Sequence, residues 1–176
     1  MNRLRSVTLA FALLFAIPTI EACASHAVEA EASQLAIADQ LRFPFVPTRE
    51  KTSGSLCTPQ DPDFERLRYE ERIPYCRRNV SRSEKADIYE AYGVPKRCRG
   101  DYTIDHFIPL SIGGTNHRDN LWPEHKSIKA LRQNLELDLY KQIDQGLITQ
   151  KEAIRIITEA KWNPPIHDPS DFEICH

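Results

Sequence analysis

The sequence has no C-x-x-C spacing, no internal repeat and no excess of basic over acidic residues. The missing C-x-x-C spacing argues against a structural zinc site. A net charge of −2 gives no global indication of a nucleic-acid partner. The apolar stretch at residues 6–20 is too short and wrongly flanked for a membrane-spanning helix. What is present is an ordinary globular composition, 41% hydrophobic and 27% charged in 176 residues, which predicts one domain.

The N-terminus has the features of an export signal. Two arginines precede the apolar residues 6–20, and small residues follow, with an A-x-A cleavage site before Ser25. We therefore expect residues 1–24 to be a signal peptide and the mature chain to be periplasmic or secreted, without a membrane span after signal removal. The alternative is a lipoprotein anchored through Cys23, although Glu21 is out of place in a lipobox.

Four cysteines follow the signal: Cys57, Cys76, Cys98 and Cys175. In an exported chain they predict two disulfides, for which three connectivities exist. Cys57 and Cys76 lie in one short polar segment, so a local bridge between them is the simplest pairing. Cys98 would then pair with Cys175 and hold the C-terminal tail.

Helix-breaking residues divide the rest of the chain. Residues 25–56 contain Pro44, Pro47 and Gly54, so we expect a flexible tether there. Residues 57–176 are expected to form one domain, irregular at its start and proline-rich in its C-terminal tail.

Capping signals and periodicity predict the elements of that domain. Ser81 and Thr149 each have a glutamate three residues later, which is typical of a helix start. Apolar residues recur at helical spacing over 126–145. The segment 101–110 is rich in β-branched and aromatic residues and predicts a strand, followed by a glycine loop and a short second strand at 120–123.

Asp105 and His106 are the candidate chemical groups of that first strand. Histidine titrates near neutral pH and can take a proton from water, and a cation can stabilise the charge that develops on a phosphate. These groups therefore suit metal-assisted hydrolysis of a phosphodiester. Neighbouring side chains on a regular strand point to opposite faces, so we expect the strand to end near Pro109 and bring both groups to one site.

The segment "IDHFIPLSIGGTNHRDNLWPEH" carries the pattern D-H-x-x-P-L-x-x-G-G-x-N followed by N-L-W-P-E. It resembles the HNH endonucleases, and the stretch from Cys57 to Trp162 resembles a bacterial group of exported HNH proteins. The resemblance implies an α+β fold, in which a ββα-metal finger is embedded in a small, mostly helical, disulfide-containing domain.

The resemblance also implies roles for individual residues. His106 matches the general base and Asp105 matches the acidic ligand of a divalent cation. Asn120 matches the asparagine that braces the loop and helps orient the histidine. Gly113 and Gly114 match the glycines of the loop.

The sequence departs from the family at the third ligand. The position nine residues after Asn120 is Lys129, which is no ligand in its charged form. His125 is the preferred substitute and Asn134 the alternative. The expected cation is Mg²⁺, with Mn²⁺ as an alternative, and Zn²⁺ or Ni²⁺ if His125 participates. Convergence of Asp105, His106 and a third ligand would favour catalysis, whereas a Lys129 amine at that point would favour a scaffold without catalysis.

A local basic segment offers contacts to phosphates. The segment from Cys76 to Arg99 contains seven basic and three acidic residues, and such a segment can bind phosphates. The leading hypothesis is an exported, metal-dependent endonuclease with DNA as the preferred substrate, RNA as the alternative, and little sequence specificity. The competing hypothesis is a degenerate HNH module that binds nucleic acid or the envelope without cleavage; an immunity partner is not indicated either way. The candidate phosphate contacts are Arg77, Arg78, Arg97, Arg99, His117 and Arg118.

Overall fold

The computed structural model describes residues 45–166, so the predicted signal, Cys23 and Cys175 lie outside the described residues. This part is an α+β structure with two antiparallel two-stranded sheets. None of its helices is long and apolar enough to cross a membrane. The elements are β1 (Phe64–Arg68), β2 (Ile73–Cys76), α2 (Arg82–Ala91), β3 (Tyr102–His106), β4 (Leu121–His125), α3 (Lys126–Ala130), α4 (Leu135–Asp144) and α5 (Gln150–Trp162), with short 3-10 helices at Lys96–Asp101, Leu110–Ile112 and Arg118–Asn120.

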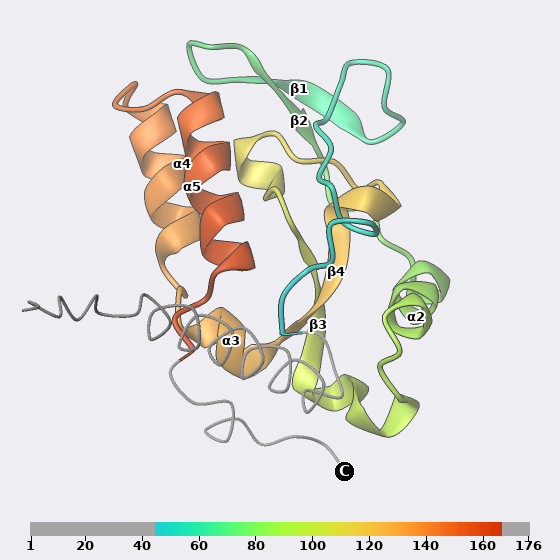
Figure 1. Cartoon of the computed structure of the whole chain (residues 1–176). Helices are drawn as coiled ribbons and strands as arrows, with labels where there is room; N and C mark the ends of the chain where they lie inside the picture. The colour runs from blue at the N-terminus through green and yellow to red at the C-terminus, as the bar shows by residue number, and fades with distance from the viewer. Residues whose placement is uncertain (1–44, 167–176) are drawn as a thin grey trace, which may run out of the picture. The chain divides into compact units, whose positions relative to one another are not determined.

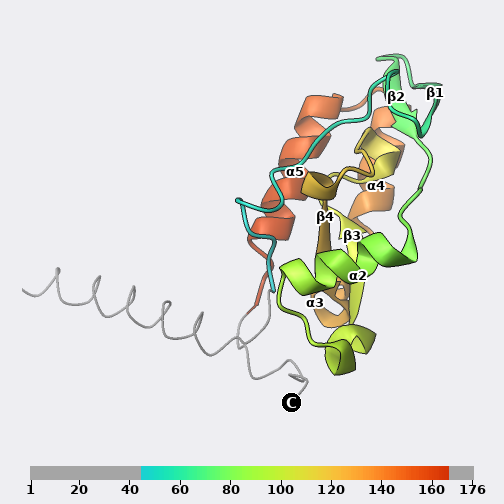
Figure 2. The same cartoon turned by 90° about the vertical axis from the view of Figure 1, so that its right-hand side faces the viewer.

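The β3–β4 pair is the centre of the domain. Helix α2 covers one face of the pair, while α4 and α5 lie side by side on the other (Figures 1 and 2). On the α2 face, Ile88 packs against Ile104 and Leu121. On the opposite face, the main hydrophobic core gathers around Trp122, Leu139 and other buried residues of the loop and the two helices. Both sides of the strand pair are therefore covered.

The two predicted helix caps are confirmed. The hydroxyl oxygen of Ser81 accepts the backbone N–H of Glu84, and that of Thr149 accepts the backbone N–H of Glu152. The predicted helix over 126–145 is wrong in one respect, because it is interrupted between α3 and α4. Apolar spacing continues through the interruption, so periodicity could not reveal it.

The segment expected to be irregular contains a hairpin. Strands β1 and β2 pair antiparallel, with a bulge between Phe64 and Arg66. The turn between them places Tyr69 at φ 61° and Arg72 at φ 56°, a conformation usually given to glycine. Neither position carries Gly, Asn or Asp, so the usual signal of a hairpin turn is missing here.

The local disulfide is confirmed. Cys57 and Cys76 are bonded, which ties the end of β2 to the segment before β1. Cys98 is disulfide-bonded as well. Its predicted partner, Cys175, lies outside the described residues, as does Cys23.

The predicted tether at 25–56 is wrong for its last part. Phe45 is buried, and the backbone N–H of Gly54 donates to the carbonyl of Asp119 at 2.8 Å. The Thr52 hydroxyl donates to the Leu121 carbonyl at 3.2 Å. Proline and glycine excluded a helix here, but an extended chain can still hydrogen-bond to a neighbouring loop and pack on it.

Candidate functional site

Asp105 and His106 meet in an open pocket of about 300 Å³ at the end of β3. The strand ends at His106, so two neighbouring side chains that would diverge along a regular strand reach one cavity. We call this cavity the Asp105 pocket. Its lining residues are Tyr75, Arg78, Asp105, His106, Pro109, Leu110, Ser111 and Glu136.

The His106 ring is held by two different partners. Its Nε2 lies 3.0 Å from Oδ1 of Asn116, and its Nδ1 lies 3.2 Å from the Arg78 guanidinium. The Asn116 amide nitrogen donates to the Arg77 carbonyl and to Asp63, which leaves Oδ1 as the acceptor for the ring. Nε2 therefore carries the proton, and Nδ1 presents its lone pair on the Arg78 side.

Burial lowers the pKa of His106 to about 4, with the Asn116 hydrogen bond opposing the change. His106 is only 3% exposed, so the charged form of its ring loses most of its hydration. His106 is therefore neutral at pH 7 and able to accept a proton.

The loop after β3 is closed by Asn120. Its amide donates to the carbonyls of Ile108 and Thr115 and accepts the backbone N–H of Ile108 at 2.8 Å. A Cβ on Gly114 would lie 1.8 Å from the Ile108 carbonyl oxygen, so only glycine fits there. Asn120 thus braces the loop, while the side chain that touches His106 is Asn116. Asn116 occupies the last position of the G-G-x-N pattern, and that position is the feature of the sequence that could have identified it.

Both oxygens of Asp105 are bound by ammonium groups. Lys129 Nζ lies 2.5 Å from Oδ1 and Lys161 Nζ lies 2.8 Å from Oδ2. Burial alone would raise the pKa of Asp105, but the charges of Lys161 and Lys129 hold it well below the usual value. Asp105 is therefore an ionised carboxylate with two fixed cationic partners.

These groups belong to a larger buried charge cluster between the strand pair and the helices after it. Glu124 hydrogen-bonds to Arg132 and lies 3.8 Å from Lys129. Burial and the nearby Asp105 raise the pKa of Glu124 to about 7. The cluster consists of Asp105, Glu124, Lys129, Arg132, Glu136 and Lys161.

The structure does not bring His125 to Asp105. In the strand register His125 lies opposite Tyr102, three pairs away from Asp105, so the two side chains leave opposite faces. The His125 ring packs edge-on against Tyr102 at 5.0 Å and its Nδ1 accepts the backbone N–H of Ser127. The prediction that Asp105 and His125 bind the same metal ion is therefore wrong.

The remaining donors do not fit a resident divalent cation. Two carboxylates, Asp105 and Glu136, line the pocket. Lys129 and Lys161 occupy both oxygens of Asp105, and Lys161 also bonds to Glu136. A second grouping, Cys57, Asp61 and Cys76, has the right proximity, but its two sulfurs form the disulfide and are not thiolates.

Of the six predicted phosphate contacts, Arg78 alone lines the Asp105 pocket. His117 pairs with Asp61 at 2.7 Å. Arg99 lies over the Tyr89 ring, 5.1 Å from its centroid. The others are placed as follows: Arg77 contributes its backbone carbonyl, Arg97 is exposed on the 3-10 helix before β3, and Arg118 lines a separate apolar hollow beside α2.

No protein-family model, no curated protein and no solved structure matches this chain.

Proposed function

We propose that this protein cleaves phosphodiester bonds of nucleic acid in the Asp105 pocket, and that β3, β4 and α3 form a finger of the HNH type. The observation that carries the proposal is the state of His106. Its ring is neutral, its tautomer is fixed by Asn116, and its lone pair faces an exposed arginine. A fixed, unprotonated histidine in an open pocket is what a general base requires.

The reaction begins when Arg78 moves away from His106, while Asn116 keeps the ring in place. Arg78 is exposed, so its guanidinium can leave Nδ1 for a phosphate oxygen and offset the charge there. A water then gives its proton to Nδ1 while its oxygen bonds to phosphorus. The phosphorus–oxygen ester bond breaks, and the leaving oxygen takes a proton from solvent. His106 returns its proton to solvent and the site is restored.

A second candidate function has its own supporting observation. Lys129 lies on Asp105, where the resemblance implies a metal ligand, and this arrangement favours a module that binds phosphate without cutting. The phosphate contacts would then be Arg78, which lines the pocket, and the partly exposed Lys129, which pairs with Asp105.

We also propose that the protein is exported. The Cys57–Cys76 bond is compatible with an oxidising compartment, and the N-terminal sequence has the features of a signal peptide.

Cleavage and binding can be measured separately on the same samples. Purified oxidised protein is incubated with labelled DNA and with RNA, and fluorescence anisotropy reports binding while gel electrophoresis reports cleavage. We expect His106→Gln to lower cleavage by about 100-fold or more and to leave binding intact, because general-base catalysis contributes roughly that factor. Arg78→Ala should weaken binding, whereas the matched control Arg155→Ala, an exposed arginine of α5, should not.

Binding without cleavage by the unmodified protein would support the second candidate. If protein shown to be folded by circular dichroism neither binds nor cleaves either nucleic acid, both candidate functions are contradicted.

A further inference from the structure

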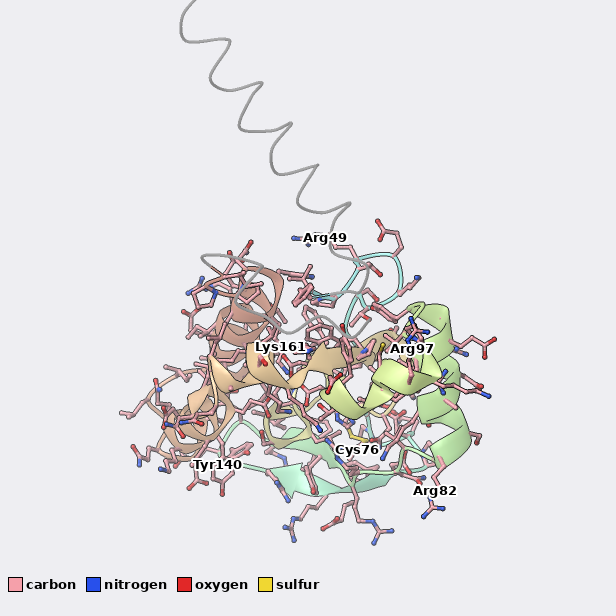
Figure 3. The ribbon with its side chains drawn as sticks, turned by 90° about the horizontal axis from the view of Figure 1, so that it is seen from below. Arg49, Cys76, Arg82, Arg97, Tyr140 and Lys161 are labelled. Carbon is pink, nitrogen blue, oxygen red and sulfur yellow. A yellow bond between two sulfur atoms is a disulfide. The ribbon has the colours of Figure 1, made fainter. Side chains whose placement is uncertain are left out.

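Lys161 has the surroundings of a bound cation. It belongs to the last turn of α5, yet its side chain is 0% exposed. Its ammonium group contacts three oxygens, namely Asp105 Oδ2 at 2.8 Å, the His106 carbonyl at 2.6 Å and Glu136 Oε1 at 3.0 Å. In Figure 3 Lys161 lies among the ribbons of the strands and helices, while Arg82 and Tyr140 lie at the edge of the molecule.

The three oxygens come from elements distant in sequence. Two belong to the end of β3 and one to the first turn of α4, and α5 supplies the lysine. Carboxylate and carbonyl oxygens are the donors that Mg²⁺ and Mn²⁺ prefer. A positive charge at this point therefore has the donor set of a hard metal ion, but the charge is covalently attached to the chain.

Displacement of Lys161 by a metal ion is strongly unfavourable. The ammonium group would lose three hydrogen bonds to charged or carbonyl oxygens, and its buried stem offers no exposed alternative. Lys129 adds a second positive charge on the other oxygen of Asp105, so an entering dication would also face repulsion.

We propose that Lys161 is the resident cation of the Asp105 pocket and that the pocket takes no divalent metal. The ammonium group neutralises Asp105, joins α5 to the end of β3, and holds the backbone of His106 in place through its carbonyl. The inference rests on the proposed function for what the pocket does, but not for which cation the pocket holds.

The test follows the His106 ring signals by NMR while Mn²⁺ is added to the oxidised chain. Mn²⁺ bound at Asp105 would broaden these signals selectively, because it would lie beside the neighbouring residue. We expect no selective broadening at equimolar Mn²⁺, and no change in melting temperature with millimolar Mg²⁺ or with a chelator. Selective broadening of His106 in the unmodified protein would overturn the proposal.

Two substitutions test whether Lys161 is what keeps metal out. Lys161→Ala frees the three oxygens, and we expect Mn²⁺ to broaden the His106 signals and to raise the melting temperature of this variant. Lys161→Gln keeps the length of the side chain and replaces the first variant if that one does not fold. Lys151→Ala, an exposed lysine of the same helix, is the matched control and should behave like the unmodified protein. A folded Lys161 variant without any response to Mn²⁺ would contradict the role of Lys161.

The outcomes separate this inference from the proposed function. Cleavage that persists with a chelator supports both. Cleavage that requires metal, together with broadening of His106, retains the nuclease and removes the lysine as resident cation. Absence of cleavage, together with absence of broadening, removes the nuclease and retains the lysine.

Discussion

The two faces of the β3–β4 pair are stabilised in different ways. The α2 face is closed by aliphatic contacts among Ile88, Ile104 and Leu121. On the opposite face, the apolar core around Trp122 lies beside a buried cluster of ion pairs centred on Asp105. Buried ion pairs stabilise a fold no better than well-packed apolar groups of the same size, but the loss of one partner is costly. The charged face is therefore suited to fix the positions of groups at the pocket, whereas the α2 face supplies ordinary packing.

Removal of the central cation should have the largest effect on stability. Lys161→Ala leaves Asp105 buried with one ammonium partner in place of two, and we expect a loss of about 3–5 kcal/mol in the free energy of unfolding. Urea denaturation followed by circular dichroism measures it. A loss below about 1 kcal/mol would mean that the charged face is no more demanding than the apolar one.

Acidification should have the second-largest effect on stability, through the protonation of His106. Its pKa is lowered to about 4 in the folded chain from an ordinary value of 6.5. Between these pH values the unfolded chain takes a proton that the folded chain does not, so this stability is fully present above pH 6.5 and falls as the pH drops to 4. The difference between the two pKa values corresponds to a loss of about 3 kcal/mol in the free energy of unfolding. Other groups also titrate, so the measurement is the difference between the unmodified chain and His106→Gln across this range. Parallel curves for the two proteins would contradict the lowered pKa.

Removal of one methylene from the α2 face should have a smaller effect on stability. Ile88 is 1% exposed, and Ile88→Val removes one methylene from its contact with Ile104 and Leu121. We expect a loss of about 1 kcal/mol, the usual cost of this change in a core. Because Ile88 does not line the Asp105 pocket, cleavage by folded protein should remain the same. A large fall in activity would show that the packing of α2 is coupled to the pocket.

An ion pair outside both faces should contribute least. Arg155 bonds to Glu152 on the surface of α5, and both side chains are largely exposed. Solvent screens such pairs, so we expect Arg155→Ala to leave the denaturation midpoint unchanged within error. A clear shift would indicate that surface charge, and not burial, governs the ion pairs of this protein.

Local signals in the sequence were sufficient for several elements. The caps at Ser81 and Thr149 and the Cys57–Cys76 pairing depend on residues close in the chain, and the structure confirms them. The hairpin was missed because Tyr69 and Arg72 adopt positive φ without glycine. The packing of residues 45–56 was missed because its partners are distant in the chain, and two of them, Asp119 and Leu121, lie more than sixty residues away.

The sequence by itself determined the types of groups at the site: an Asp-His pair, a glycine loop and an asparagine to brace it. Those choices are local, since a strand end and a tight loop restrict which residues fit. The tertiary structure alone decided which partners these groups meet. Asn116 fixes the tautomer of His106, and Lys161 reaches Asp105 across 56 residues of chain. A lysine near the end of an amphipathic helix ordinarily reads as solvent-exposed, and only the packing of α5 against the end of β3 turns it into a buried cation.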